Sequence, residues 1–432
     1  MAAAAAGLRH RPAGASEPGG ATTGGSSGEQ RERRRERLGR PSAVQRAASW
    51  CCWTTALGVV LFVVLCMALV GGPRELYECC EPMWQPELVE PEPGALALEG
   101  RTALVTGANR GYGLGAARHL AEQGARVVMA CRTLNPAAAD SLTAGLLRDF
   151  GPDHPGSVEM VHVDLTDLPS VAALATSADI PALDIVVLNA AVVDDRSAPY
   201  KLKAPGGATL NRMYAVNYLA NVVLVQELIR SGKLALRDSP AHRPEQATDS
   251  HEWLQYRSPM PRLVVISSGS YAQGGTEWFG ADGTHDWVVM SAMRNYGQTK
   301  FLQAVWALDL QHAMGGRLDV VLHNPGPVHT ELGSEHVPPI LGPVYRAMKW
   351  LLFVEPYEAA APLRWLVSSQ APPATYLHIR ERTMHHNMAG NVLDESVRAW
   401  VRTRTNETLK DAGLVALEPE RLARGGGDNR RR

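Results

Sequence analysis

The sequence predicts an α/β domain built on a doubly wound parallel sheet and preceded by one transmembrane helix. Short β-branched runs alternate with longer helical patterns from Arg101 onward, which is typical of a parallel sheet covered by helices on both faces. A glycine cluster lies directly between the first such run and its helix, and a long uncharged apolar segment precedes the whole domain. The composition agrees with a substantial core, since 45% of the 432 residues are hydrophobic.

The N-terminal part of the chain divides into an arm and a membrane span. Residues 1–49 are rich in Ala, Gly, Ser and Arg without apolar periodicity, so we expect a disordered arm. Residues 50–72 contain no charge, and as a helix rising about 1.5 Å per residue they would extend about 34 Å, enough to cross a hydrocarbon core. A cleaved signal peptide would have a shorter apolar region nearer Met1. We therefore interpret residues 50–72 as a transmembrane helix in the lipid membrane.

The charges beside this helix predict its orientation. Arginines between Arg31 and Arg46 precede it, whereas glutamates and only Arg74 follow it closely. By the positive-inside rule we expect a single-pass protein of the endoplasmic reticulum, with a cytosolic N-terminus and a lumenal C-terminal domain. The sequon that begins at Asn406 is compatible with a lumenal face. The net charge is -1 and no aromatic residues accompany the basic run, so we expect no nucleic-acid partner.

The remaining chain is expected to form a stalk, a domain and a tail. Prolines and glutamates over residues 73–100 indicate a stiff acidic stalk. One folded domain is expected over residues 101–400 and a polar tail over residues 401–432. The expected strands are Thr102–Val105, Arg126–Ala130, Val158–Val163, Ile185–Leu188, Arg262–Ile266 and Leu318–His323.

The glycine cluster predicts a phosphate-binding turn. Glycine permits a tight turn and a close backbone approach to a pyrophosphate, which the free N–H groups of the following helix would bind. A cluster alone is weak evidence in a chain with 40 glycines, but its place between a strand and a helix favours a Rossmann-type dinucleotide site. The residues of this turn are Thr106, Gly107, Ala108, Asn109, Arg110, Gly111, Tyr112 and Gly113.

The end of the second strand indicates which dinucleotide binds. An NAD-type site would offer Asp or Glu to the ribose hydroxyls there, whereas this chain has Cys131 and Arg132. A guanidinium can pair bidentately with a 2′-phosphate, and Arg110 in the turn can supply a second positive charge. We therefore expect NADP(H) rather than NAD(H). The alternative is that Arg132 is only a solvated strand-end residue.

A tyrosine and a lysine four residues apart are the expected catalytic pair. Tyr296 and Lys300 open a helix in which such positions share one face, so both groups can point into one cleft. A nearby cation favours phenolate, and we therefore expect a Tyr296 pKa lowered toward neutrality, which makes a usable general acid or base. Tyr345 and Lys349 repeat the spacing. Because they follow the last central strand, we interpret them as a surface or packing coincidence.

Two polar residues complete the constellation. Ser268 ends the fifth strand and precedes the Tyr296 helix, where its hydroxyl can polarise a carbonyl. Asn217 lies in the helix after the fourth strand and offers an amide to a water or to a backbone group. Serine also caps helices and asparagine satisfies buried backbone groups, but this order along an alternating chain is hard to obtain by accident.

With these residues in place, the chain from Arg101 to about Ile379 resembles the short-chain dehydrogenase/reductase family. The residues around Arg132 and the His-Asn-Pro-Gly and Thr-Glu-Leu runs look most like its retinol-dehydrogenase-like branch. The resemblance implies no metal and a catalytic set of Asn217, Ser268, Tyr296 and Lys300. It implies cofactor contacts from Gly107, Asn109, Arg110, Gly111, Tyr112, Gly113, Arg132, Asp164, Leu165, Asn189, Tyr296, Lys300, Pro325, Gly326, Val328 and Thr330.

Two departures from the family pattern affect these expectations. The usual Asn-Asn-Ala-Gly after the fourth strand appears as Leu-Asn-Ala-Ala at residues 188–191, which keeps Asn189 but loses one amide and the final glycine. Ser268 and Tyr296 also lie further apart than in shorter members, so the stretch Gly269–Asn295 is expected to shape the substrate mouth. Ser270 remains a rival for the role of Ser268.

The resemblance implies an NADP(H)-dependent oxidoreductase that interconverts a carbonyl and an alcohol. A membrane anchor beside the site suggests a lipophilic substrate such as a retinoid, a steroid or a fatty carbonyl. Members of the family often dimerise, so a homodimer is one expected assembly. The alternative function is a non-catalytic NADP(H)-binding scaffold or redox sensor, against which the intact set of four polar residues argues.

Overall fold

The computed structural model describes the C-terminal domain of the chain. The described residues are 97–132, 135–193, 201–203, 206, 209–237, 261–276, 292–332, 342–367, 376–378, 383–385 and 392–415. The predicted arm, the segment 50–72 and most of the stalk lie outside this range, as do residues 277–291 of the stretch expected to shape the substrate mouth. Among the residues that the structure describes, no helix combines the length and the hydrophobicity that a membrane crossing requires.

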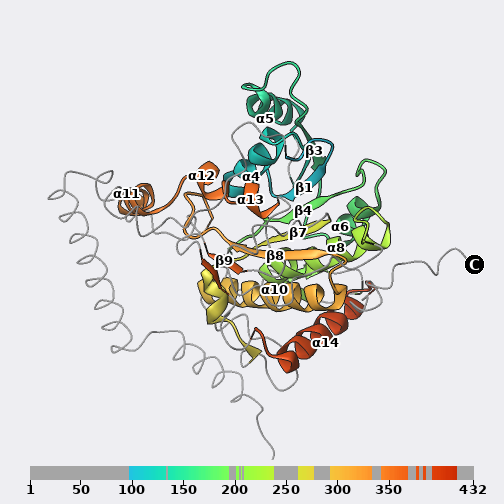
Figure 1. Ribbon diagram of the computed structural model, residues 1–432. Helices are drawn as coiled ribbons and strands as arrows, with labels where there is room; N and C mark the ends of the chain where they lie inside the picture. The colour runs from blue at the N-terminus through green and yellow to red at the C-terminus, as the bar shows by residue number, and fades with distance from the viewer. Residues whose placement is uncertain are drawn as a thin grey trace, which may run out of the picture. The chain divides into compact units, whose positions relative to one another are not determined.

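The centre of the domain is one sheet whose described strands follow the order β10-β9-β8-β7-β4-β1-β2-β3 (Figure 1). Neighbours are parallel except β9 and β10, and the order reverses between β1 and β4, as in a doubly wound Rossmann-type sheet. The predicted fold of this domain is thus confirmed, with each central strand correct to within one residue. The strands are β1 Thr102–Thr106, β2 Arg126–Cys131, β3 Ser157–His162, β4 Ile185–Leu188, β7 Arg262–Ile266, β8 Asp319–Asn324, β9 Tyr376–His378 and β10 Thr383–His385.

Alternating strand residues build two separate cores, one on each face of the sheet. Val105, Val127 and Ile185 belong to the core beneath α4, α12 and α13, whereas Leu104, Val128 and Val186 belong to the core under α6, α8 and α10. Figure 1 shows α4 and α10 on opposite sides of the sheet. The helices are α4 Gly111–Glu122, α5 Pro136–Leu147, α6 Leu168–Thr176, α7 Arg212–Tyr214, α8 Ala220–Arg230, α10 Ala292–Met314, α11 Gly342–Leu352, α12 Pro356–Ala360, α13 Leu363–Leu366 and α14 Glu395–Asp411.

Three irregular elements complete the described chain. A π-helical turn, η2, spans Ala215–Leu219 directly before α8, and a 3₁₀ turn, η3, spans Gly269–Gln273 directly after β7. A separate antiparallel pair joins β5 Lys201–Lys203 to β6 Thr209–Asn211. The two helical turns matter for function, because each lies where the sequence predicts a polar site residue.

Packing contacts extend past both ends of the range expected for the folded domain, residues 101–400. Leu98 is buried and its N–H bonds Gln123 O at 2.9 Å, so the domain begins before Arg101. At the other end, α14 continues past Trp400, the expected boundary, because Val401 and Leu409 are buried against the core. A sequence with so many charged residues conceals this apolar stripe, which explains the expectation of a polar tail.

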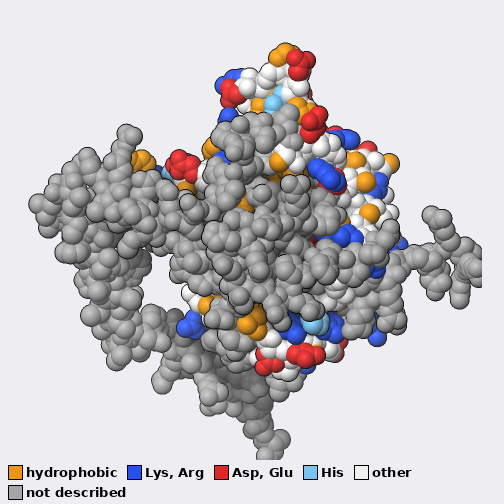
Figure 2. Space-filling model, in the orientation of Figure 1, with side chains coloured by type: hydrophobic (Ala, Val, Ile, Leu, Met, Phe, Trp, Pro, Cys, Tyr) orange, Lys and Arg blue, Asp and Glu red, His pale blue; other side chains and the backbone are white. Residues whose placement is uncertain are grey.

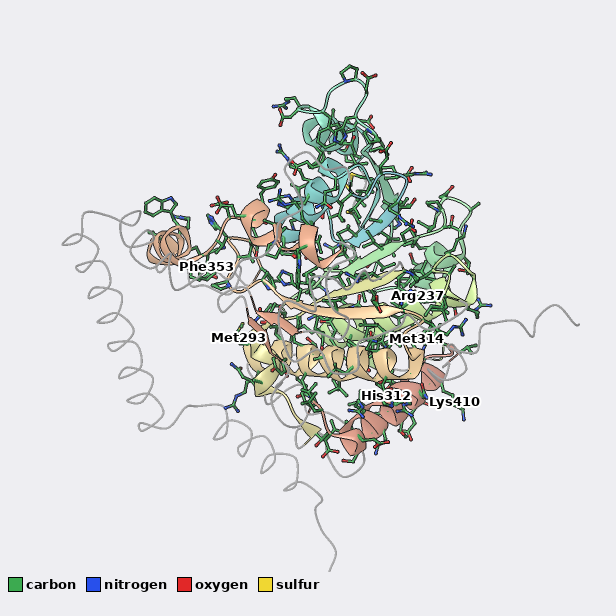
Figure 3. The ribbon with its side chains drawn as sticks, in the orientation of Figure 1. Arg237, Met293, His312, Met314, Phe353 and Lys410 are labelled. Atoms are coloured by element: carbon green, nitrogen blue, oxygen red, sulfur yellow. The ribbon has the colours of Figure 1, made fainter. Side chains whose placement is uncertain are left out.

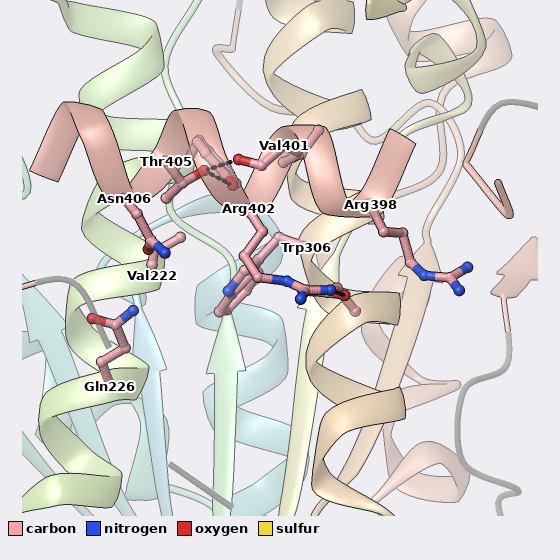
Figure 4. Close-up of a pocket in the computed structure, with 10 residues that line it drawn as sticks. Val222, Gln226, Trp306, Arg398, Val401, Arg402, Thr405 and Asn406 are labelled. Atoms are coloured by element: carbon pink, nitrogen blue, oxygen red, sulfur yellow. Dashed lines mark hydrogen bonds and ion pairs between the residues drawn. The ribbon is translucent and has the colours of Figure 1, made fainter. Parts of the chain in front are cut away.

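The contact of α14 with α8 and α10 is a packing seam rather than a ligand site. Figure 4 looks into its small hollow, where Thr405 and Arg402 of α14 face Trp306 of α10 and Gln226 of α8. Arg402 forms two hydrogen bonds to the Asp309 carboxylate, at 2.9 and 2.6 Å. None of the predicted site residues lines this hollow.

Candidate active site

The carboxyl ends of the parallel strands bring the predicted site residues to one edge of the sheet, where doubly wound sheets bind ligands. The glycine turn follows β1, and Ser268 follows β7. Val163 N bonds Cys131 O at 2.9 Å, which joins the chain after β3 to the end of β2. The residues that follow the other strands at this edge are Arg132 after β2, Asp164 and Leu165 after β3, Asn189 after β4, and Pro325, Gly326, Val328 and Thr330 after β8.

The glycine turn is held in a tight, fixed form. Gly107 and Gly111 have positive φ values of 65° and 56°, which favour glycine. A Cβ on Gly113 would lie 2.4 Å from Gly107 O, so only glycine lets α4 begin this close to the turn. Asn189 Nδ2 donates to Thr106 O at 2.9 Å and to Gly107 O at 3.2 Å. Asn189 therefore holds the turn in place, and the loss of the neighbouring amide leaves this contact intact.

The start of α4 fits an anionic group. The helix has no capping side chain and no acidic residue in its first turn, so its first N–H groups and its positive dipole end face no competing carboxylate. Asn109 is exposed, and its backbone N–H bonds the thiol of Cys131. Tyr112 is buried, with its ring centroid 5.8 Å from that of His323. The uncapped start of α4 thus fits the pyrophosphate of a dinucleotide.

The two arginines predicted for the 2′-phosphate differ in their surroundings. Arg110 Nη1 lies 2.9 Å from Glu331 Oε2, and both side chains are largely exposed. Exposed ion pairs contribute about 0–1 kcal/mol, so a phosphate can displace this carboxylate. Arg132 is exposed at the end of β2. Asp164 Oδ1 accepts hydrogen bonds from the backbone and the hydroxyl of Thr166, so this carboxylate is committed to its own turn.

Tyr296 lies against the turn that follows β7. A Cβ on Gly297 would come within 2.6 Å of Ser270 O, so glycine at this position allows α10 to approach η3 closely. Ser268 forms a side-chain hydrogen bond with Tyr296, and Ser270 Oγ lies 2.9 Å from Ser268 Oγ. Ser268 is therefore the serine next to the phenol, whereas Ser270 supports it.

Lys300 is fixed one turn further along α10. Its Nζ donates to Ile266 O at 2.7 Å and to Gln303 Oε1 at 2.9 Å, and it lies 5.7 Å from the centroid of the Tyr296 ring. Figure 3 shows α10 running from Met293 toward Met314 along one face of the sheet. Because Ile266 ends β7, the lysine ties the helix directly to a central strand.

The expected lowering of the Tyr296 pKa is wrong. Burial raises the pKa of Tyr296 to about 12, and the hydrogen bond with Ser268 opposes this only in part. Burial also lowers the pKa of Lys300 to about 7. Spacing on a helix placed the two groups together, but it could not show that both would be desolvated, which disfavours phenolate and ammonium alike.

Asn217 is held entirely within the protein. It lies in the π-helical turn, where its Oδ1 accepts from Val192 N at 2.8 Å and its Nδ2 donates to Val192 O at 2.9 Å and to Thr299 Oγ1 at 3.1 Å. Its backbone carbonyl accepts from Asn221 Nδ2 at 2.8 Å. The backbone of Val192 is thus one of the partners that the sequence predicted for this amide.

Sequence reasoning missed three residues that support the site. Thr299 Oγ1 joins Asn217 to Tyr296 O, and Asn221 binds the carbonyl of Asn217. Gln303 lies three residues after Lys300 on the same helical face, a spacing that could have identified it. Asn221 lies four residues after Asn217, a helical spacing that could also have identified it.

The segment after β8 closes against the glycine turn. A Cβ on Gly111 would lie 3.0 Å from Thr330 Cγ2, and Thr330 N bonds Val328 O at 2.7 Å. Lys349 Nζ donates to Thr330 O and lies 5.3 Å from the centroid of the Tyr345 ring. The second tyrosine-lysine pair is therefore a packing contact of α11. Packing was one of the two interpretations that the sequence suggested for this pair.

Known proteins resemble this chain in sequence. A sequence model described as short chain dehydrogenase matches residues 101–235, a range that ends before Ser268. Dehydrogenase/reductase SDR family member 13 of Bos taurus is 31% identical over 267 residues, which cover 61% of this chain and 61% of that protein. Retinol dehydrogenase 14 of Homo sapiens is 27% identical and covers 64% of this chain and 76% of its own length.

A further sequence relative and one solved structure are also similar to this chain. Polyprenol dehydrogenase of Mus musculus is 27% identical over 69% of this chain and 80% of its own length. An uncharacterised crystal structure from Mycobacterium paratuberculosis covers 75% of this chain and 99% of its own, with a TM-score of 0.50 at 20% identity, and thereby shows the fold. The chain spans 61% and 60% of the length of the first two curated relatives.

The buried lysine predicts a specific pH dependence of stability. The folded pKa of Lys300, about 7, lies below the value of about 10.4 for an exposed lysine. Between these values the unfolded chain holds a proton that the folded chain has lost, so this residue makes stability rise with pH by up to about 1.4 kcal/mol per pH unit. We expect the melting temperature of the wild type minus that of Lys300→Met to increase from pH 7 to pH 9.

Differential scanning fluorimetry of the full chain in detergent micelles would measure this difference. Lys410→Met, which replaces an exposed lysine on α14, serves as the matched control and should show a flat difference over the same range. A flat difference for Lys300→Met would contradict the burial of an uncharged amine.

Proposed function

Because the chain belongs to the short-chain dehydrogenase/reductase family, in its retinol-dehydrogenase-like branch, we propose that it is an NADP(H)-dependent oxidoreductase that interconverts a carbonyl and an alcohol. One observation carries the proposal: the Tyr296 phenol lies buried in hydrogen-bond contact with Ser268, beside Lys300 and at the edge of the sheet where dinucleotides bind. We propose Tyr296, Ser268, Lys300 and Asn217 as the catalytic set.

In this proposal each side chain has a distinct task. The hydroxyls of Ser268 and Tyr296 hold the substrate oxygen, and Tyr296 transfers the proton to or from it. The raised pKa keeps the phenol protonated near neutral pH, which is the form that donates a proton during carbonyl reduction. Lys300 fixes the helix to Ile266, while Asn217 fixes it through Thr299. The bound cofactor supplies or accepts the hydride.

We propose NADP(H) on the basis of the charges at the strand ends. The start of α4 fits the pyrophosphate, with contacts from the turn residues Gly107 to Gly113. Arg132 and Arg110 offer guanidinium groups to a 2′-phosphate, and no acidic residue stands at the end of β2 where an NAD-type site would need one. In this proposal Asp164 and Leu165 contact the adenine, and the segment Pro325–Thr330, which approaches the glycine turn at Thr330, closes over the nicotinamide.

The proposed substrate is a lipophilic alcohol, ketone or aldehyde, such as a retinoid, a steroid or a fatty carbonyl. The uncharged segment 50–72 supports a membrane anchor, which would place the enzyme where such molecules partition. Two relatives are named retinol dehydrogenase and polyprenol dehydrogenase, and both names refer to lipophilic alcohols. A homodimer remains a prediction from the family.

The proposed topology has the N-terminus in the cytosol and the catalytic domain in the lumen of the endoplasmic reticulum. The arginines before residue 50 support it. The sequon adds little, because Asn406 lies within α14 and the Thr408 hydroxyl bonds Arg404 O at 2.9 Å. Protease added to sealed vesicles should leave the C-terminal domain intact. Digestion of that domain would place it in the cytosol.

The activity is tested by carbonyl-dependent loss of NADPH fluorescence. Full chain in detergent micelles should consume NADPH faster than NADH when it meets a panel of retinoid, steroid and aliphatic carbonyls. Tyr296→Phe should lower the rate by about 10²- to 10⁴-fold, the usual contribution of a general acid, while NADPH binding persists. Tyr345→Phe alters the other tyrosine-lysine pair and should keep the wild-type rate.

Two outcomes would contradict the proposal. If Tyr296→Phe turned over carbonyls as fast as the wild type, the catalytic assignment would be wrong. If the wild type bound NADPH tightly but consumed none across the panel, the scaffold function would take its place.

A further inference from the structure

Helix α11 is joined to the candidate site at both of its ends. The chain leaves the site after Thr330, forms α11 and returns at Val354, which pairs in parallel with Val328. Val354 N donates to Pro327 O at 3.0 Å, and His329 N donates to Val354 O at 2.8 Å. Figure 3 labels Phe353 at this return point. Any force that positions α11 therefore acts on residues 325–330, the segment that closes against the glycine turn.

The two sides of α11 differ in their surroundings. Tyr345 is half-buried and Lys349 is buried, and both face the domain through the contact of Lys349 with Thr330 O. Pro343, Arg346 and Trp350 are exposed, and their spacing of three and four residues puts them on one helical face. Trp350 is 66% exposed, an unusual position for so large an apolar side chain.

The charge of this region is entirely basic. Between Glu335 and Glu355 the sequence contains no acidic residue, whereas Arg346 projects from the exposed face of α11. Leu332, which is 41% exposed, adds a second apolar side chain near the same closing segment. Elsewhere, charged side chains of both signs are interspersed over the described surface that Figure 2 shows. An exposed Trp and Arg on one face of an amphipathic helix are typical of contact with a membrane interface.

We propose that the exposed face of α11, formed by Pro343, Arg346 and Trp350, rests on the lipid bilayer and holds the mouth of the active site against it. Trp350 enters the headgroup region, and Arg346 pairs with lipid phosphate groups. This proposal rests on the membrane anchor proposed for residues 50–72. It adds a second contact, made by the catalytic domain itself.

A bilayer fits this face better than a protein partner does. A stable protein interface buries about 800 Å² on each partner, far more than three side chains of a short helix provide. A chain already anchored in the membrane needs only weak additional contacts, because tethering gives the domain an effective concentration near the millimolar range. The contact would let a lipophilic substrate pass from the bilayer to the site without crossing water.

Fluorescence quenching by brominated lipid tests the proposal in the full chain. The chain has 10 tryptophans, so the signal of Trp350 is obtained as the difference between the wild type and Trp350→Phe. Both proteins are placed in nanodiscs of brominated phosphatidylcholine and in matched discs without bromine. The matched control is the same difference for Trp400→Phe, which isolates a half-buried tryptophan on α14.

We expect the bromine to reduce the Trp350 difference signal by roughly half or more and to leave the Trp400 signal unchanged. Arg346→Glu should weaken the quenching of Trp350. An unquenched Trp350 would overturn the proposal, as would equal quenching of both tryptophans, since that would indicate unspecific adsorption. Flotation of the chain with the discs reports the anchor separately, and the NADPH assay reports the activity, so failure of either is distinguishable from failure of this contact.

Discussion

The site depends on the close contact between the start of α10 and the turn that follows β7. Gly297 makes this contact possible, because any side chain there would meet Ser270 O. Lys300 then reaches Ile266 O, the last carbonyl of β7. β7 is itself paired on both sides, to β4 and β8, so the helix is fixed to a strand that cannot shift alone. The sheet therefore fixes the position of Tyr296 through these contacts of α10.

A second set of contacts fixes the opposite side of the same helix. Asn217 joins the chain after β4, through Val192, to Thr299 on α10. The carbonyl of Asn217, which lies in the π-helical turn, accepts a hydrogen bond from the side chain of Asn221. Asparagine here is a structural link between two elements, which explains why it is wholly buried. Catalytic geometry and core packing thus use the same residues.

Much of the fold and of the site could be predicted from the sequence, because both follow from short-range patterns. The strands β4, β7 and β8 are buried along their whole length and appear as apolar runs rich in β-branched residues. Tyr296 and Lys300 are neighbours by helical spacing alone. What could not be predicted depends on distant contacts. The raised pKa of Tyr296 results from burial by the whole domain, the Arg110–Glu331 pair joins residues 221 positions apart, and the buried stripe of α14 requires α10 as its partner.

The measurement that tests this account most directly compares two glycine substitutions in the NADPH assay. Gly297→Ala places a methyl group against Ser270 O, whereas Gly145→Ala places one in open space on α5. A displacement of about 1 Å at a catalytic group can cost on the order of 10²-fold in rate. We predict that Gly297→Ala loses at least about tenfold in turnover while it still binds NADPH, and that Gly145→Ala keeps the wild-type rate. Wild-type turnover by Gly297→Ala would contradict the claim that this contact positions Tyr296.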